Sequence, residues 1–259
     1  MCSSDLRFDD SFLVDALKDQ LVQREGPDTG PYTGWAVDSR KVTDDAIFAA
    51  LAGSQSDGHQ FIAAACAKGA KAVLCRTDWT GHPPAGVTFY RVKDPFEALR
   101  LLGRKWRSKL QCPVIAVAGS VGKTTTKEMT AALLRGKFSR VTATKGSENG
   151  FLGIPLTLLR TPLDCQALVV EIGIDAPGAM AQHLEMVRPT VGLVTAIAPE
   201  HLEQLHDLET VAKEESLCLE WIANHGGPAI INGDDPFLSP LRHSLHARHP
   251  VAFGLDPGV

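Results

Sequence analysis

The second half of the chain alternates short apolar runs with stretches of helical spacing. The apolar runs are VIAVA at 114–118, RVTAT at 140–144, ALVVEIG at 167–173, VGLVTAIA at 191–198 and AIING at 229–233. Helical segments lie between them, the first at 123–134. Continuous apolar strands separated by helices are typical of a mainly parallel sheet that is covered on both faces. We therefore predict an α/β fold whose ligands bind beyond the carboxyl ends of the strands.

The first half of the chain has shorter elements. Apolar residues at helical spacing over 8–24 predict a helix, with Asp10 or Ser11 as its cap. The runs AIFAAL at 46–51 and KAVLC at 71–75 predict short buried strands.

Two further helices and a proline suggest where the first domain ends. One helix precedes Gly69, which closes it, and another is predicted over 95–109. Cys112 precedes a proline, so its backbone favours the extended conformation that suits a junction. We predict a small α/β domain at 1–110 and a phosphate-loop sheet domain at 111–259.

Composition narrows the class of protein. The chain has 259 residues, 44% of them hydrophobic and 22% charged, with a net charge of −4. This balance gives no reason to expect nucleic acid or an anionic membrane as a partner. No apolar run approaches the ~20 residues of a membrane helix, and the first ten residues lack the apolar core of a signal peptide. The six cysteines form no CxxC pair, which favours reduced thiols and a cytoplasmic location.

The stretch GSVGKTT at 119–125 joins the first apolar run to the first helix, and it has the composition of a phosphate-binding loop. Its glycines allow a tight turn whose backbone N–H groups point inward, and the helix then begins at the bound anion. Lys123 would reach the β and γ phosphates, and the Thr124 hydroxyl would bind the magnesium that accompanies a nucleotide. The alternative is a chance glycine-rich turn. The predicted ATP-binding residues are Gly119, Ser120, Val121, Gly122, Lys123, Thr124 and Thr125.

Two other strand ends carry polar side chains that such a site needs. Glu171 ends an apolar strand, where a buried carboxylate is costly unless it is paired or binds a metal. His201 follows the next strand and is a competent metal ligand. The alternatives are a glutamate that emerges into solvent and an ordinary surface histidine. We predict that Thr124, Glu171 and His201 are metal ligands that meet in one pocket.

These motifs resemble the Mur ligase family. AGSVGKTTTKEM is similar to the family's shortened phosphate loop, in which the first glycine lies three residues before the second. IPLTLLR, VVEIG, HLE followed by VAKEE, and INGDDP match in order and spacing. In the first half, VDSRKV, IFAALAG and DGHQFIAAACAKGAKAV resemble the domain that binds the UDP end of the substrate. The resemblance covers about residues 35–240.

The resemblance implies an ATP-dependent carboxylate–amine ligase of peptidoglycan precursor synthesis. Within the family, the match is best to the branch that adds D-alanyl-D-alanine to a UDP-N-acetylmuramoyl tripeptide through an acyl phosphate, with ATP and Mg²⁺. It implies catalytic roles for Lys123, Glu171 and His201. The implied substrate-binding residues are Asp38, Ser39, Arg40, Lys41, His59 and Asn149. The alternative for His59 is helix capping.

Two residues depart from the family pattern. The loop GSENGFLG keeps Asn149 but has Gly150 in place of a second asparagine. The family usually has a carbamylated lysine as an anionic ligand at the position of Glu215. Our hypothesis is that Glu215 supplies that carboxylate directly and so joins the catalytic set. The alternative is a solvated charge on a helix beside Glu214.

The chain also stops earlier than the family pattern does. Mur ligases have a C-terminal domain that binds the incoming amine, and the resemblance ends near residue 240. We expect a missing C-terminal domain or a partner chain, and an isolated chain that binds nucleotide weakly and ligates poorly or not at all. Two other functions remain open. They are a ligase of the same superfamily with a non-muramyl acceptor, and a nucleotide-binding module without catalytic activity.

Overall fold

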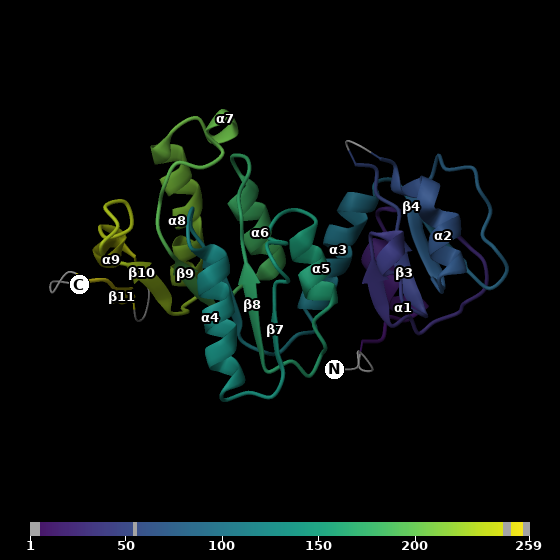
Figure 1. Ribbon diagram of the computed structural model, residues 1–259, viewed down its shortest axis with the longest axis horizontal. Helices are drawn as coiled ribbons and strands as arrows, with labels where there is room; N and C mark the ends of the chain where they lie inside the picture. The colour runs from purple at the N-terminus through teal and green to yellow at the C-terminus, as the bar shows by residue number, and fades with distance from the viewer. Residues whose placement is uncertain (1–5, 54–55, 246–249, 256–259) are drawn as a thin grey trace. The chain divides into compact units, whose positions relative to one another are not determined.

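The structure is a computed structural model, and it describes residues 6–53, 56–245 and 250–255. The chain divides into two compact units (Figure 1). The first comprises Met1–Lys109 with Leu158–Leu163, and the second comprises Leu110–Thr157 with Asp164–Val259. The predicted domain boundary at 110/111 lies one residue from this division, apart from the short segment that returns to the first unit.

The first unit contains a five-stranded sheet in the order β1-β5-β4-β3-β2. All its strand pairs are parallel except β1 with β5. Its elements are α1 (Asp10–Leu17), β1 (Leu21–Glu25), β2 (Gly34–Ala36), the 3₁₀ turn η1 (Ser39–Lys41), β3 (Ala46–Ala49), the 3₁₀ turn η2 (Gly58–Phe61), α2 (Ile62–Ala67), β4 (Ala72–Arg76), β5 (Thr88–Val92) and α3 (Pro95–Arg107).

The predicted helix over 8–24 is wrong in its second half. Helix α1 ends at Leu17, and residues 21–25 form strand β1. Asp9 is the cap, since its carboxylate accepts a hydrogen bond from the Phe12 N–H at 2.7 Å. The apolar spacing of the sequence did not show that β1 gains its backbone hydrogen bonds by pairing antiparallel with β5.

Aromatic side chains fill the space beneath α1 and α3. The ring of Phe8 lies 4.4 Å from that of Trp106 and 5.6 Å from that of Trp35, measured between centroids. The Trp106 indole N–H donates to the Thr161 carbonyl at 2.8 Å, which fastens the returning segment 158–163 to α3. These contacts give the first unit a core of its own.

The second unit contains a six-stranded sheet in the order β11-β10-β9-β6-β8-β7, with every pair parallel. Its elements are β6 (Val114–Ala118), α4 (Lys123–Arg135), β7 (Val141–Ala143), α5 (Gly153–Leu159), β8 (Ala167–Glu171), α6 (Ala179–Val187), β9 (Val191–Val194), α7 (Leu202–Leu205), α8 (Leu208–Asn224), β10 (Ala229–Asn232), α9 (Leu241–Ser244) and β11 (Val251–Phe253). The prediction of an α/β fold with a mainly parallel sheet is confirmed.

The strand order places the phosphate loop at the point where the chain changes direction. From β6 the chain crosses to β7 at one edge, and then returns through β8 to β9 on the other side of β6. Because such crossovers are right-handed, α4 covers one face of the sheet, and α5, α6 and α8 cover the other. Helix α4 packs on β6, β7 and β8, and α8 packs on β9 and β10. Ligands of parallel sheets bind at this kind of switch point.

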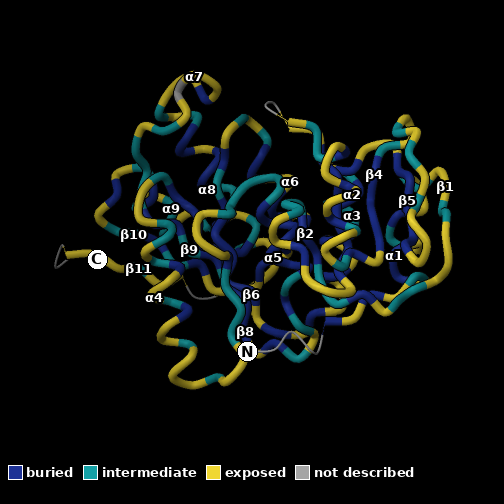
Figure 2. Tube along the Cα trace, turned by 45° about the vertical axis from the view of Figure 1, so that its right-hand side comes forward, coloured by how far each residue is buried: buried dark blue, intermediate teal, exposed yellow. Residues whose placement is uncertain are grey.

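Burial differs sharply between the central strands and helix α4. Strands β6 and β8 are buried along their whole length. By contrast, α4 appears mostly as exposed and intermediate residues in Figure 2. Only two of its 13 residues, Lys127 and Ala131, are buried. A lysine therefore occupies one of the two positions at which α4 faces the interior.

Candidate active site

The phosphate loop is held in shape by close packing against the strand end of β9. Gly119 has φ +111°, a backbone conformation that residues with a side chain rarely adopt. A Cβ at this position would lie 2.3 Å from Thr195 Oγ1. The Ser120 N–H donates to the Ala196 carbonyl at 2.7 Å, and the Thr195 hydroxyl donates to the Val121 carbonyl at 2.6 Å. Glycine at 119 is thus required by both the backbone angle and the lack of space.

Helix α4 begins directly after the loop, with Gly122 at φ +83° as its N-cap residue. The cap has no side chain to accept a hydrogen bond from the first turn. Backbone N–H groups of the first helical turn are therefore available to an anion, and the helix dipole favours negative charge there. This is the arrangement that the sequence predicted.

Two of the predicted metal ligands meet beside the loop. The Thr124 hydroxyl donates to Glu171 Oε1 at 3.0 Å, and the Asn149 amide donates to the same oxygen at 2.7 Å. Glu171 is buried at the end of β8, so the alternative of a solvent-facing glutamate is wrong. Together these residues line a pocket of about 220 Å³, whose lining is Ser120, Gly122, Lys123, Thr124, Thr125, Ser147, Asn149 and Glu171.

The chemistry of this pocket fits a magnesium ion. Mg²⁺ binds hydroxyl and carboxylate oxygens and keeps several ligands from water and phosphate. The Thr124 hydroxyl oxygen and Glu171 Oε1 are two such oxygens, and they lie 3.0 Å apart. Glu171 Oε2 is buried and has no hydrogen-bond partner, which leaves it as a further acceptor. The described residues contain no cluster of three or more His, Cys, Asp or Glu side chains placed to bind one metal ion together.

Lys123 is held by a residue that the sequence analysis missed. Its ammonium group lies 3.1 Å from Glu200 Oε2 and donates to the Ser120 carbonyl at 3.1 Å. Glu200 is half-buried in the segment after β9. A carboxylate shortly after the apolar run at 191–198 was the available signal, because similar reasoning identified Glu171.

Glu215 lies behind the loop. It is fully buried on α8, and its Oε2 accepts a hydrogen bond from the Gly119 N–H at 2.7 Å. The alternative of a solvated helix face is wrong, because Glu214 is buried too and accepts from the Gly178 N–H at 2.8 Å. Burial raises the pKa of Glu215 to about 8, although Lys123 and the Gly119 N–H act in the opposite direction.

The Glu215 carboxylate therefore supports the backbone of the loop. It does not line the pocket that contains Thr124 and Glu171. The hypothesis that Glu215 replaces an anionic metal ligand gains no support from this geometry, and the observed contact is with the turn that precedes the helix.

His201 does not join Thr124 and Glu171. It is exposed, adopts φ +47°, and precedes α7. It is not among the residues that line the pocket. The predicted meeting of three metal ligands in one pocket is thus seen for two of them only.

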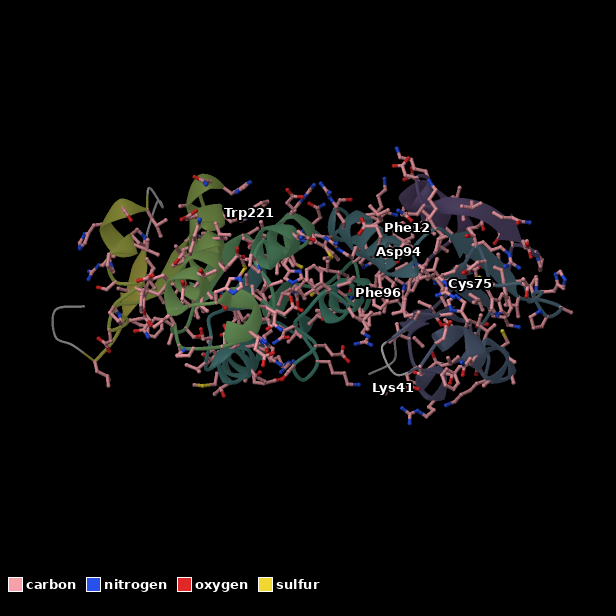
Figure 3. All side chains as sticks on the ribbon, turned by 90° about the horizontal axis from the view of Figure 1, so that it is seen from above. Phe12, Lys41, Cys75, Asp94, Phe96 and Trp221 are labelled. Atoms are coloured by element: carbon pink, nitrogen blue, oxygen red, sulfur yellow. The ribbon has the colours of Figure 1, made fainter. Side chains whose placement is uncertain are left out.

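The predicted substrate residues of the first unit form a turn after β2. Asp38 accepts from the Arg40 N–H and caps η1, and it also pairs with the Arg40 guanidinium at 2.9 Å. These hydrogen bonds lower the pKa of Asp38 to about 2. Ser39 is half-buried, whereas Arg40 and Lys41 are exposed, and Figure 3 shows Lys41 at the surface. The turn presents two cations to solvent.

His59 has a structural role. Its Nδ1 lies 2.5 Å from Asp57 Oδ1, and its Nε2 accepts from the Arg76 N–H at 2.9 Å. Asp57, rather than His59, caps η2. Both ring nitrogens are engaged within the unit, so we correct the prediction that His59 binds substrate.

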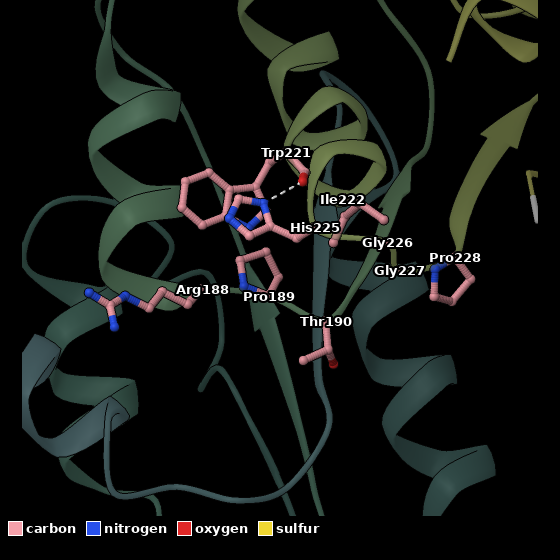
Figure 4. A pocket seen from close by; sticks show the side chains of 9 residues that line it. All are labelled: Arg188, Pro189, Thr190, Trp221, Ile222, His225, Gly226, Gly227 and Pro228. Carbon is pink, nitrogen blue, oxygen red and sulfur yellow. Dashed lines mark hydrogen bonds between the residues drawn. The ribbon is translucent and has the colours of Figure 1, made fainter. Parts of the chain in front are cut away.

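A larger pocket of about 740 Å³ lies at the amino-terminal ends of strands β9 and β10 (Figure 4). It includes Thr190 and Pro228, which immediately precede strands β9 and β10. Trp221 and His225 stack at 4.2 Å above Pro189 in the view of Figure 4. None of the predicted site residues lines this pocket, so its size does not identify it as the active site.

The family assignment follows from the comparison with family models. The model described as "Mur ligase middle domain" matches residues 117–257, which is more than half of the chain. The chain belongs to the Mur ligase family. A second model, "Mur ligase family, catalytic domain", matches residues 31–106. The resemblance seen in the sequence is confirmed over both units.

Curated Mur ligases named UDP-N-acetylmuramoyl-tripeptide–D-alanyl-D-alanine ligase are similar to this chain. The one from Synechocystis is 34% identical over 228 residues, which is 85% of this chain and 48% of the relative. The one from Escherichia coli is 35% identical over 198 residues, which is 76% of this chain and 42% of the relative. The chain spans about half the length of the curated relatives that it matches.

Solved structures of MurF are similar in fold. MurF from Acinetobacter baumannii matches with a TM-score of 0.79 and 27% identity, over 97% of this chain and 53% of that one. MurF from Thermotoga maritima in complex with ADP matches with a TM-score of 0.68 and 26% identity, over 85% of this chain and 49% of that one. Of the helices in the described ranges, none combines the length and apolarity needed to cross a bilayer.

Proposed function

We propose that this chain forms the substrate- and nucleotide-binding part of an ATP-dependent ligase that joins D-alanyl-D-alanine to a UDP-N-acetylmuramoyl tripeptide. The observation that carries the proposal is the convergence of Thr124, Glu171 and Asn149 beside Lys123, at the switch point of the sheet. The names of the curated relatives and the ADP complex of a MurF relative support the choice of reaction and nucleotide.

The loop and helix α4 would bind the triphosphate of ATP. Backbone N–H groups of the loop and of the first helical turn donate to phosphate oxygens, and Lys123 exchanges Glu200 for the β and γ phosphates. Magnesium would be held by Thr124 and Glu171, and when bound it supplies positive charge that neutralises the transferring phosphoryl group. Phosphoryl transfer relies mostly on such positioning and charge neutralisation.

The substrate carboxylate attacks the γ-phosphorus, which gives an acyl phosphate and ADP. The amine of the incoming dipeptide then attacks the acyl carbon, and inorganic phosphate leaves. This activation is needed because a carboxylate is a poor electrophile. Asn149 lies beside Glu171, from where its amide can orient a substrate oxygen near the phosphate.

The turn at 38–41 would bind the UDP end of the substrate. Arg40 and Lys41 are exposed cations that can pair with a pyrophosphate. Asp38 fixes the turn through its bonds to Arg40, and Ser39 contributes a hydroxyl. His59 is left out, because both its ring nitrogens have partners.

The test is calorimetric titration of ADP with magnesium into the wild type and Lys123→Met. Methionine keeps the length of the side chain and removes its charge, so we expect about 100-fold weaker binding. Lys137→Met, at an exposed lysine beyond the end of α4, is the control and should bind like the wild type. Equal affinity in the wild type and Lys123→Met would refute the phosphate site.

A second experiment separates a ligase from a nucleotide-binding module. ADP release from ATP is followed with UDP-N-acetylmuramoyl tripeptide, with and without D-alanyl-D-alanine. We expect release to depend on the muramyl substrate. Release that ignores every muramyl substrate would instead support a module that binds nucleotide without joining peptides.

A further inference from the structure

Lys127 is a fully buried lysine on a mostly exposed helix. It lies four residues after Lys123 on α4, and therefore on the same face of the helix, one turn further from the loop. Its side chain has no exposed surface. A lysine usually keeps its ammonium group in water, so complete burial requires partners inside the protein.

The partners of Lys127 are the elements that build the metal pocket. Its Nζ donates to the Thr144 carbonyl at 2.9 Å and to the Gly146 carbonyl at 2.7 Å. Both belong to the loop that follows β7 and carries Ser147 and Asn149, two residues of the pocket lining. The same ammonium group lies 3.7 Å from Glu171 Oε2, the carboxylate oxygen that has no hydrogen-bond partner.

The loop and Glu171 are also joined to each other. The Glu171 N–H donates to the Thr144 hydroxyl at 3.0 Å, and Asn149 donates to Glu171 Oε1 at 2.7 Å. Lys127 therefore closes a ring of contacts in which one oxygen of Glu171 faces Thr124 and the other faces the lysine. An apolar side chain could fill the same space, but it would leave two carbonyls and a buried carboxylate without this partner.

The exposed contact of Lys127 does not explain its burial. Glu128 Oε1 lies 2.7 Å from the same Nζ, but the Glu128 side chain is 55% exposed. Ion pairs with exposed partners contribute little to stability. The inward contacts are the ones that connect Lys127 to the pocket.

We propose that Lys127 is a positioning residue for the divalent cation that accompanies the nucleotide. It holds the 144–149 loop and orients the Glu171 carboxylate so that Oε1 meets the Thr124 hydroxyl. The inference rests on the proposed function, since it concerns the same nucleotide site. It assigns a role to a residue that does not itself line the pocket.

The test compares ADP binding with magnesium and with EDTA in the wild type, Lys127→Met and Glu128→Gln. Changes in the residues that support metal ligands typically weaken metal binding about 10- to 100-fold. We expect Lys127→Met to lose about that much of the tightening of ADP binding by magnesium. Its affinity for ADP in EDTA should stay within about twofold, because Lys123 and the loop amides are unchanged. Glu128→Gln should match the wild type.

A direct readout of the cation is Mn²⁺ binding in the presence of ADP, followed by electron paramagnetic resonance. Lys127→Met should show the same loss, and Lys127→Arg, which keeps the charge and the donors, should regain part of it. If Lys127→Met does not fold, Lys127→Gln replaces it, since its amide can still donate to one carbonyl without carrying charge.

The outcomes separate this inference from the function on which it rests. Magnesium-dependent ADP binding that is equal in the wild type and Lys127→Met overturns the role of Lys127 and leaves the nucleotide site standing. Equal losses with magnesium and with EDTA also overturn it, because they indicate a general structural effect. Failure of the wild type to bind ADP overturns both.

Discussion

The two units treat their buried charges differently. In the first unit, the Arg91 guanidinium pairs with both oxygens of Glu25 and also donates to the carbonyls of Trp79 and Gly81. Asp57, His59 and the Arg76 backbone likewise form a closed set of hydrogen bonds. These groups are satisfied without any ligand.

The second unit leaves buried polar atoms without partners around the phosphate loop. They are Ser120 Oγ and Glu171 Oε2, whereas the Glu200 and Glu215 carboxyl groups form a hydrogen bond that raises the pKa of Glu215. Within the described residues, every buried carboxylate oxygen that lacks a partner belongs to this unit. Buried polar groups are nearly always hydrogen-bonded in native proteins, so a cluster of exceptions marks a place where a ligand completes the structure.

The difference shows how each unit can recognise an anion. The first unit offers exposed cations on a turn whose own hydrogen bonds are complete. The second encloses its acidic groups and its lysines together, so that a nucleotide and cation bound at the proposed site would become part of its interior. Ligand binding should therefore stabilise the second unit more than the first.

The largest expected effect comes from adding one methyl group to a glycine in each unit. Gly119→Ala places a Cβ 2.3 Å from Thr195 Oγ1 at φ +111°, whereas Gly86 has φ +79° and open space around it. We expect Gly86→Ala to cost about 1–2 kcal/mol from backbone strain alone, and Gly119→Ala about 2–5 kcal/mol from strain and overpacking. Urea unfolding measures both, and ADP titration should show loss of binding only for Gly119→Ala. Equal costs would show that the loop can yield to a side chain.

The next effect is a pH dependence that originates in Glu215. Its pKa of about 8 in the folded protein lies above the ordinary value of 4.5, chiefly because of burial. Between these values the unfolded chain releases the proton while the folded protein keeps it, so stability falls as pH rises from about 4.5 to 8. Glu215→Gln removes this loss. The melting temperature of the variant, relative to that of the wild type, should therefore rise as pH increases.

The control for this experiment is Glu220→Gln, at an exposed position of the same helix. Melting curves between pH 5 and 9 should run parallel for Glu220→Gln and the wild type. Parallel curves for Glu215→Gln and the wild type would contradict the raised pKa of Glu215.

The smallest effect is expected in the first unit. Arg40 is 87% exposed and pairs with Asp38 at the surface, so Arg40→Ala should leave the melting temperature unchanged within about 1 °C. Asp38→Ala removes the cap of η1 and should lower it by about 2–4 °C. Scanning calorimetry gives both values. A large loss in Arg40→Ala would mean that the exposed cations support the fold, and that the first unit is not complete by itself.

The sequence predicted the parts of the site that depend on strand order. Thr124 follows strand β6 and Glu171 ends the adjacent strand β8, and the carboxyl ends of these parallel strands lie side by side. An apolar strand that ends in a carboxylate is visible in the sequence, and so is a glycine-bracketed turn before a helix. The meeting of Thr124 and Glu171 follows from these local patterns, whereas the contact of Asn149 with Glu171 was not predicted.

What the sequence did not predict depends on packing between distant elements. Burial of Lys127 and Glu215 arises because α4 faces the β7 loop and α8 faces the phosphate loop, and neither contact leaves a periodic signal. The loop conformation of 197–201 decides that Glu200 reaches Lys123 while His201 is exposed. The early end of α1 has a similar cause, because β1 owes its existence to pairing with β5.

The ion pair between Lys123 and Glu200 would compete with a phosphate for the lysine in the proposed nucleotide site. A phosphate that enters the loop gains the lysine only after the carboxylate has withdrawn, so its observed affinity is lower than that of a loop with a free lysine. A single phosphate makes few contacts to offset the loss of the ion pair, whereas the tail of a nucleoside triphosphate makes many. We therefore expect the proposed site to favour a nucleoside triphosphate over a single phosphate.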